Sequence, residues 1–350
     1  MKTLFRGKHF ITLDDYSREE VDSLLDVSRY LKMKFALNEP HRMLQDKTVF
    51  MMFFEQSTRT RNSMEAGITQ LGGHAHDLTP DKMQLSHGES AKDTAEVLSG
   101  MGHAIACRNC FFGYGEKNQL GNNYLRELAQ YSRIPVMSLQ DDWYHPMQGL
   151  ADLLTIQEKF GTNLKGLKIC ISWAYATSHA KPLSVPQSQI LLFPRYGMDV
   201  VVAGPKEFPF MPEIVEKAKK NASDGGGSLK FVDNMEEGFR GAHIVIPKNW
   251  GGFLGVKPPK GQARVEYLGT DEAKKQMKTN LEKHKGWICN EKLMKITDRR
   301  SVYMHALPAD RGKEVVDSVI DGPRSIVIDE AENRIHTAKA VMALTMGGRP

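Results

Sequence analysis

A run of hydroxyl and guanidinium side chains, STRTR at 57–61, is the segment best suited to chemistry. It follows an apolar run at 47–54, typical of a buried strand, and precedes an amphipathic segment that predicts a helix. Ligands of parallel α/β sheets bind where strands end, and the first turn of a helix offers unpaired N–H groups to an anion. Arginine can also bind two phosphate oxygens at once. The segment therefore predicts a phosphate site, while a helix cap with two surface arginines is the plain alternative.

Three further polar motifs follow predicted strands or open a predicted helix. In DWYHPMQ at 142–148, a histidine can donate to a carbonyl oxygen and a glutamine can accept from an amide N–H. YMHALP at 303–308 ends in a proline, which blocks further strand pairing. DEAENR at 329–334 opens the last helix with acidic residues that complement the helix dipole. Alone, each motif is equally compatible with a solvated or structural role.

Apolar runs alternate with amphipathic segments along the chain, which indicates parallel sheets built from βαβ units. Buried strands are predicted at 47–54, 103–107, 134–139, 167–173, 198–205 and 242–247. Helices are predicted at 15–36, 149–161 and 211–222, and in the last segment. We therefore expect an α/β fold of two domains, each with a central parallel sheet flanked by helices. The expected domains are 1–148, closed by a C-terminal helix at 331–348, and 149–330.

Length and composition limit the class of protein. A chain of 350 residues is long for one core, which favours two domains. The net charge of +5 suits an anionic small substrate, and without a basic stripe we expect no nucleic-acid partner. The first residues lack the apolar core of a signal peptide, and no apolar run approaches the roughly 20 residues that cross a bilayer. We therefore expect a cytoplasmic protein with no membrane partner.

The four cysteines predict free thiols. Only Cys107 and Cys110 form a CxxC pair, and one pair without a second is weak support for zinc. Reduced thiols are the usual state of cysteine in the cytoplasm. We accordingly expect neither a metal site nor a cofactor.

Together, the motifs STRTR, HPMQ, HALP and DEAENRIH resemble those of the aspartate/ornithine transcarbamylase superfamily in their order and spacing. The resemblance covers nearly the whole chain. It implies a carbamoyltransferase, which moves the carbamoyl group of carbamoyl phosphate to an amine of a small molecule and releases phosphate. Such a reaction requires oriented partners and a stabilised oxyanion, but no covalent nucleophile. A phosphate-binding oxidoreductase would instead carry G-x-G-x-x-G after its first strand, which this sequence lacks.

The resemblance also implies roles for individual residues. Arg108, His145 and Arg334 would stabilise charge on the carbamoyl group and act as the catalytic residues. Gln148 and the backbone carbonyl of Leu307 would hold the carbamoyl nitrogen. The complete set implied to bind carbamoyl phosphate is Ser57, Thr58, Arg59, Thr60, His87, Arg108, His145, Gln148, Leu307 and Arg334.

The segment SHGES at 86–90 resembles a loop that reaches into the site of a neighbouring subunit. His87 stands where several relatives have lysine. The resemblance therefore implies a homotrimer with shared sites.

The second half of the chain resembles the knotted transcarbamylases, such as the acetylornithine and succinylornithine enzymes. The similar segments are the proline-rich KPLSVPQ at 181–187 and the lysine loop IPKNW at 246–250, and they imply a trefoil knot in the second domain. The chain is most similar to the YgeW-like branch, which implies an acceptor like ureidoglycine. An acylated ornithine, 2,3-diaminopropionate or putrescine stays open as acceptor, as does a non-catalytic homologue that binds an anion.

Two departures argue against ornithine as the acceptor. The chain lacks the SMG segment of the ornithine enzymes, and Ala306 stands where they have cysteine. The residues implied to bind the second substrate are Lys181, Lys248, Asp142 and His305.

Overall fold

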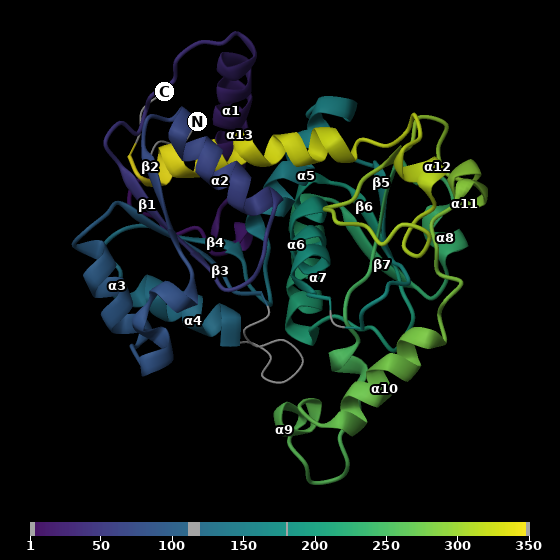
Figure 1. The fold of residues 1–350 in the computed structure, drawn as a ribbon. Helices are drawn as coiled ribbons and strands as arrows, with labels where there is room; N and C mark the ends of the chain where they lie inside the picture. Colours follow the sequence, from purple (N-terminus) through teal and green to yellow (C-terminus); the bar gives the residue numbers. More distant parts are fainter. Residues whose placement is uncertain (1–3, 111–119, 180, 348–350) are drawn as a thin grey trace. The chain divides into compact units, whose positions relative to one another are not determined.

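Two parallel β-sheets organise the chain in the computed structural model, which describes residues 4–110, 120–179 and 181–347 (Figure 1). The first sheet has the strand order β2-β1-β3-β4. Its strands are β1 (Thr48–Phe53), β2 (His74–Leu78), β3 (Ala104–Arg108) and β4 (Val136–Gln140). The second sheet has the order β7-β6-β5-β8-β9. Its strands are β5 (Lys168–Trp173), β6 (Asp199–Ala203), β7 (Ser228–Val232), β8 (Ile244–Lys248) and β9 (Val302–Tyr303).

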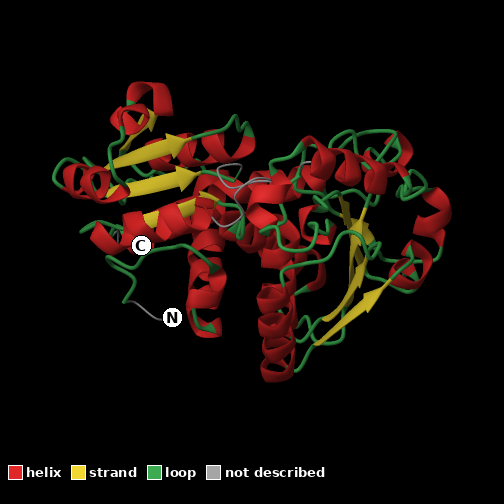
Figure 2. Ribbon diagram, turned by 90° about the horizontal axis from the view of Figure 1, so that it is seen from below, coloured by secondary structure: helices red, strands yellow, loops and turns green. Residues whose placement is uncertain are grey.

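Helices flank both sheets, as Figure 2 shows in red around the yellow strands. Those that begin in the first half of the chain are α1 (Arg18–Ala36), α2 (Arg59–Gln70), α3 (Ala91–Ser99), α4 (Leu120–Tyr131) and α5 (Pro146–Phe160). Those that follow are α6 (Ser184–Leu192), α7 (Pro212–Gly225), α8 (Met235–Phe239), α9 (Arg264–Leu268), α10 (Asp271–Glu282), α11 (Glu291–Lys295), α12 (Asp317–Ile320) and α13 (Val327–Thr345). The predicted α/β class with two parallel sheets is confirmed.

The chain forms two compact units that divide between Leu154 and Thr155, within α5. From Ala331 onward, within α13, the chain belongs to the first unit again. In Figure 1 the yellow α13 lies beside α2, and the contact of Lys339 with Gln70 joins these helices (2.9 Å).

Local sequence explains several of these boundaries. Ser17 caps α1 in a capping box with Glu20, so the helix begins at Arg18. The strand expected around 303 is only two residues long, Val302–Tyr303. Strand β2 was not predicted, because its sequence HAHDL is polar and its residues are at most half-buried at the edge of the sheet.

Each unit has its own apolar core. In the first, α3 and α4 pack on β1 and β3 through buried residues that include Met52, Ala95, Ile105 and Leu125. In the second, α8, α11 and α12 pack on the sheet through residues that include Cys170, Phe239, Leu293 and Val319. All four cysteines are buried free thiols. Within the described residues, no helix is long and apolar enough to cross a membrane.

A histidine joins the starts of two neighbouring strands in each unit. The N–H of Thr48 donates to Nδ1 of His103 (3.1 Å), and the N–H of His103 donates to the carbonyl of Thr48 (2.9 Å). In the second unit, the N–H of Lys168 donates to Nδ1 of His243 (3.1 Å), and the N–H of His243 donates to the carbonyl of Lys168 (2.8 Å). We call each pair of bonds a histidine clasp. Because Nδ1 is the acceptor, each clasp requires an imidazole that carries no proton on that nitrogen.

Candidate active site

The first turn of α2 is open to an anion. Thr58 precedes the helix, its side chain makes no capping hydrogen bond, and the first turn contains no acidic residue. The positive end of the helix dipole is therefore not compensated by a carboxylate of its own first turn. Ser57 is half-buried and Thr58 exposed, whereas Thr60 is buried. This arrangement fits the phosphate site that the sequence predicts.

The two arginines of this segment differ in their surroundings. Arg61 forms an ion pair with Asp77 of β2, and its guanidinium lies 4.1 Å from the centre of the Phe53 ring. It therefore has a structural contact inside the first sheet. Arg59, the first residue of α2, is half-buried. Of the two arginines that the sequence offers to phosphate, Arg59 is the better placed for it.

A buried hydrogen-bond network joins three of the predicted site residues. Arg334 on α13 donates to Thr60 Oγ1 on α2 (2.8 Å) and to Gln148 Oε1 on α5 (2.5 Å). Gln148 in turn donates through Nε2 to Asp152 (2.7 Å). We call these four residues the Arg334 network, and all four are buried. Its bonds fix the orientation of the Gln148 amide and hold the guanidinium beside the first turn of α2.

Two more predicted residues lie at the carboxyl ends of strands in the first sheet. Arg108 ends β3 and donates to the side chain of Gln140 at the end of β4. His145 is buried directly before α5, and its carbonyl accepts the N–H groups of Gln148 and Gly149 (3.0 and 3.1 Å). Parallel sheets bind ligands at this edge.

Asp141, which sequence reasoning missed, shapes the loop after β4. One carboxylate oxygen accepts from the N–H groups of Trp143 and Tyr144 (both 2.7 Å), and the other accepts from the Ser138 hydroxyl (3.0 Å). Burial and the neighbouring Asp142 raise the pKa of Asp141 to about 7. The loop that carries His145 is therefore built on a carboxyl group that resists ionisation.

Two further residues of the predicted set, Asp142 and His87, belong to the first unit. Asp142 is buried in the first unit and accepts from the N–H of Asn122 on α4 (2.9 Å), whereas Lys181, Lys248 and His305 belong to the second unit. His87 is exposed at the end of the short 3₁₀ helix Gln84–His87. This contact of Asp142 supports the start of α4, and its role toward a substrate stays a prediction.

In the second unit, Lys181 pairs with Asp310 (3.4 Å). Asp310 also accepts from the N–H and the hydroxyl of Thr177 (both 2.7 Å). Burial alone would raise the pKa of Asp310, but the bonds from Thr177 and the charge of Lys181 lower it below its usual value. A carboxylate therefore holds Lys181 in place.

A buried histidine–carboxylate pair lies close to Lys248. Nε2 of His305 lies 3.4 Å from Glu314, whose oxygens also accept from the N–H groups of Asn249 and Asp310 (both 2.6 Å). Burial alone would raise the pKa of Glu314, but His305, the charge of Lys248 and the bond from Asn249 hold it well below its usual range. Burial also lowers the pKa of His305. Glu314 is thus an ionised residue at the base of this cluster.

The tautomer of His305 follows from its neighbour. The N–H of Leu307 donates to Nδ1 of His305 (2.8 Å), so the ring proton lies on Nε2, which faces Glu314. Leu307 itself has a left-handed backbone (φ +48°), which is uncommon for leucine, and its bond to Pro308 is cis. Sequence reasoning named His305 and Leu307 but missed Asp310 and Glu314. These two follow directly in the sequence as ADRGKE at 309–314, which was the available signal.

In the described part of the chain, no three His, Cys, Asp or Glu side chains are grouped so that they could hold a metal ion. The fold and the clusters fit a two-domain transferase that binds a small anion on one domain and a small polar molecule on the other.

The chain belongs to the aspartate/ornithine carbamoyltransferase family, as the resemblance of its motifs predicts. The family's carbamoyl-P binding domain matches residues 8–158, and its Asp/Orn binding domain matches residues 167–345. The chain is 34% identical to YgeW of Escherichia coli K12, with 98% of this chain and 91% of YgeW covered. It is 35% identical to the ornithine carbamoyltransferase of Pyrococcus abyssi, with 99% and 98% covered.

Solved structures of carbamoyltransferases have the same fold. The ornithine carbamoyltransferase of Pyrococcus furiosus superimposes with a TM-score of 0.82 at 34% identity, over 100% of both chains. An N-acetyl-L-ornithine transcarbamylase superimposes with a TM-score of 0.83 at 31% identity, over 96% of this chain and 99% of the other. The protein is therefore an enzyme of the carbamoyltransferase family that uses carbamoyl phosphate.

Proposed function

We propose that this carbamoyltransferase transfers the carbamoyl group to an amine of a small, ureidoglycine-like molecule that carries a carboxylate. Carbamoyl phosphate would bind to the first domain, with its phosphate at the start of α2 on Ser57, Thr58, Arg59 and Thr60. The observation that carries the proposal is the Arg334 network, since it brings a buried guanidinium into contact with that first turn.

The roles of the other first-domain residues follow from their chemistry. Arg108, His145 and Arg334 would donate to the carbamoyl oxygen as charge develops on it, which is commonly worth about 3 kcal/mol for one donor. Gln148 would hold the carbamoyl nitrogen, as would the carbonyl of Leu307. The phosphate leaving group can take the proton of the amine, so the reaction needs no separate general base.

The acceptor site would use Lys181 and Lys248, with His305 beside them. Asp310 and Glu314 support this role, since Asp310 pairs with Lys181, Glu314 faces His305, and the charge of Lys248 acts on Glu314. An ammonium group suits a carboxylate on the acceptor. Lys248→Met should therefore raise the KM for the acceptor or lower kcat, and leave the affinity for carbamoyl phosphate near that of the wild type.

Three further properties belong to the proposal. The active form would be a homotrimer in which His87 completes a neighbouring site, in keeping with its exposure on a short helix. The second domain would contain a trefoil knot, which stays a prediction from resemblance. The compartment would be the cytoplasm, since four free cysteines fit a reducing environment.

A panel of amines tests the proposal. The protein is incubated with carbamoyl phosphate and either ureidoglycine, N-acetylornithine, 2,3-diaminopropionate, putrescine or ornithine, while phosphate release and ureido product are followed. We expect turnover with ureidoglycine and little with ornithine. Efficient citrulline formation would overturn the choice of acceptor. Tight binding of carbamoyl phosphate without turnover of any amine would favour the alternative, a non-catalytic homologue that binds an anion.

A further inference from the structure

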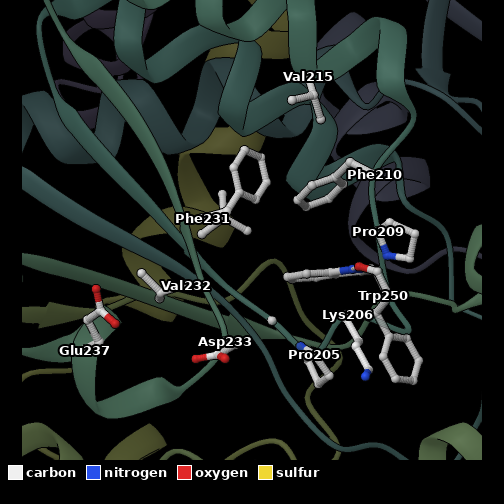
Figure 3. A pocket seen from close by; sticks show the side chains of 13 residues that line it. Pro205, Lys206, Pro209, Phe210, Val215, Phe231, Val232, Asp233, Glu237 and Trp250 are labelled. Carbon is white, nitrogen blue, oxygen red and sulfur yellow. Dashed lines mark hydrogen bonds between the residues drawn. The ribbon is translucent and has the colours of Figure 1, made fainter.

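A cavity of about 600 Å³ lies in the second unit, and none of the residues proposed for carbamoyl transfer lines it (Figure 3). Its walls come from the ends of β6 and β7, from the segments that follow them and from Trp250. Among the residues that line it are Lys206, Phe210, Phe231, Asp233, Glu237 and Trp250.

The cavity lies where α/β folds bind small molecules. Val202 and Gly204 come from the end of β6, and Val232 and Asp233 from the end of β7. Both strands are parallel, so their carboxyl ends meet at the same edge of the sheet. A volume of this size is in the usual range for a small-molecule pocket, roughly 300–1,000 Å³.

The interior is aromatic and held in shape. Phe210 stacks on Trp250 with ring centres 5.0 Å apart, and Phe231 lies 6.2 Å from Phe210. The indole N–H of Trp250 donates to the carbonyl of Phe208 (2.9 Å), which fixes that ring. Phe231 is 44% exposed, so its ring offers apolar surface to the cavity. A ligand with an apolar group would cover that surface.

The rim carries charges of both signs. Lys206 and Asp233 are exposed, and neither forms an ion pair with any residue that the structure describes. Figure 3 shows their charged ends on one side of the cavity and the rings of Phe210 and Phe231 on the other. Glu237, also at the rim, is paired with Lys230 (2.6 Å). One cation and one anion are therefore open to a ligand next to an apolar interior.

We propose that this cavity binds a free α-amino acid with an apolar side chain, such as leucine or phenylalanine. The ammonium group would lie at Asp233, the carboxylate at Lys206, and the side chain among Phe210, Phe231 and Trp250. A nucleotide fits less well, because a phosphate at this rim would meet two carboxylates and only one lysine. A purely apolar ligand would leave both rim charges unused.

Calorimetry on the full-length protein tests the class of ligand. L-Leucine and L-phenylalanine should bind at millimolar concentration or below. N-acetyl-L-leucine lacks the ammonium group and L-leucinamide lacks the carboxylate, so each should bind at least about tenfold more weakly, as expected for loss of one charge-assisted contact. Absence of binding by both amino acids, equal binding of the blocked forms, or stronger binding of AMP would overturn the proposal.

Variants locate the site. Asp233→Asn, Lys206→Met and Phe231→Ala change exposed residues, so the fold should survive them. Each should weaken binding of L-leucine about tenfold while carbamoyl transfer continues at the wild-type rate. Lys219→Met is the matched control, since Lys219 is exposed on α7, paired with Glu216 and absent from the cavity wall. Unchanged binding in all three rim variants would place the amino acid elsewhere and refute the assignment.

Discussion

Arg59 and Arg61 have the same side chain and lie two positions apart, yet the fold gives them different tasks. Arg61 is held by Asp77 and by the face of the Phe53 ring, so its charge is used within the first sheet. Arg59 begins α2 at the uncompensated end of the helix dipole. Position along a single helical turn therefore separates a structural arginine from the one assigned to substrate.

Replacement of Arg59 by alanine should remove binding of carbamoyl phosphate and leave the fold intact. A hydrogen bond to a charged group contributes about 1.5–3 kcal/mol, so the affinity should fall at least about tenfold to a hundredfold. Calorimetry with carbamoyl phosphate measures this, and circular dichroism checks the fold. Arg61→Ala is the matched control and should bind carbamoyl phosphate almost as the wild type does. If Arg59→Ala bound it as tightly as the wild type, the phosphate site would lie elsewhere.

The sequence predicted residues that stand in recognisable motifs and missed those that support them. Thr60, Gln148 and Arg334 were named from three distant motifs, and the fold joins them in one network. Asp141 and Glu314 were not named, because a buried carboxylate becomes informative only when its partners are known. Several of their partners are backbone N–H groups, which leave no trace in the pattern of side chains.

Among the helices, α13 connects two others through the side chain of one arginine. Its Arg334 binds α2 through Thr60 and α5 through Gln148, so three helices far apart in sequence meet at one guanidinium. The same helix carries Lys339, whose ammonium contacts Gln70 at the end of α2. The turn proposed to bind phosphate is therefore supported by α13, the last helix that the structure describes.

Thr60→Val should lower the free energy of unfolding by about 1–3 kcal/mol, because it keeps the size of the side chain and leaves a buried guanidinium N–H without its acceptor. Urea denaturation measures the change. Thr69→Val, on the same helix, is the control. Thr69 is exposed and its hydroxyl bonds only to the Glu65 carbonyl one turn earlier, so its loss should cost little. Equal losses in the two variants would show that α13 does not depend on Thr60.

The loop after β4 should make stability depend on pH through Asp141. Its pKa is raised to about 7 in the folded chain, so its contribution is full below the ordinary carboxyl pKa and is lost as the pH rises towards 7. The limiting slope in that window is about 1.4 kcal/mol per pH unit. Asp141→Asn should reduce the slope of the free energy of unfolding against pH, measured by urea denaturation at several pH values. Asp224→Asn, at an exposed position on α7, should leave that slope unchanged. An unchanged slope in Asp141→Asn would mean that the carboxyl group ionises normally.

Secondary structure was predictable where apolar runs were continuous. The strands β1, β3, β4, β5, β6 and β8 were all expected from such runs, since a strand buried on both faces consists mostly of apolar residues. The edge strand β2 has no such run, and α3 and α4 were not singled out. Helix α3 has only three buried residues, so its apolar stripe is narrow. The edge strand β2 and a thinly buried helix such as α3 depend on their neighbours, which the sequence does not display.

At the scale of the whole molecule, we expect a trimer or a multiple of trimers. His87 is exposed on a short helix directly before α3, and in the proposed assembly it would complete the site of the adjacent subunit. Light scattering of the purified protein measures the mass, and kinetics of His87→Ala measure the role of the side chain. A fully active monomer would contradict both the assembly and the role of His87.

The histidine clasps tie the refolding of each unit to a contact between residues that lie far apart in the sequence. They join residues 55 positions apart in the first unit and 75 apart in the second, and parallel pairing over such distances is slow because chain closure costs entropy. Each clasp needs a neutral imidazole, and burial lowers the pKa of His103, so its stabilising contribution is lost only as the pH falls through that lowered value. We therefore expect acid to delay the refolding of the first unit. Stopped-flow refolding of the wild type and of His103→Ala at several pH values measures this. We expect the pH dependence in the wild type and not in the variant, and wild-type rates that do not vary with pH would show that the clasp closes only after the sheet has formed.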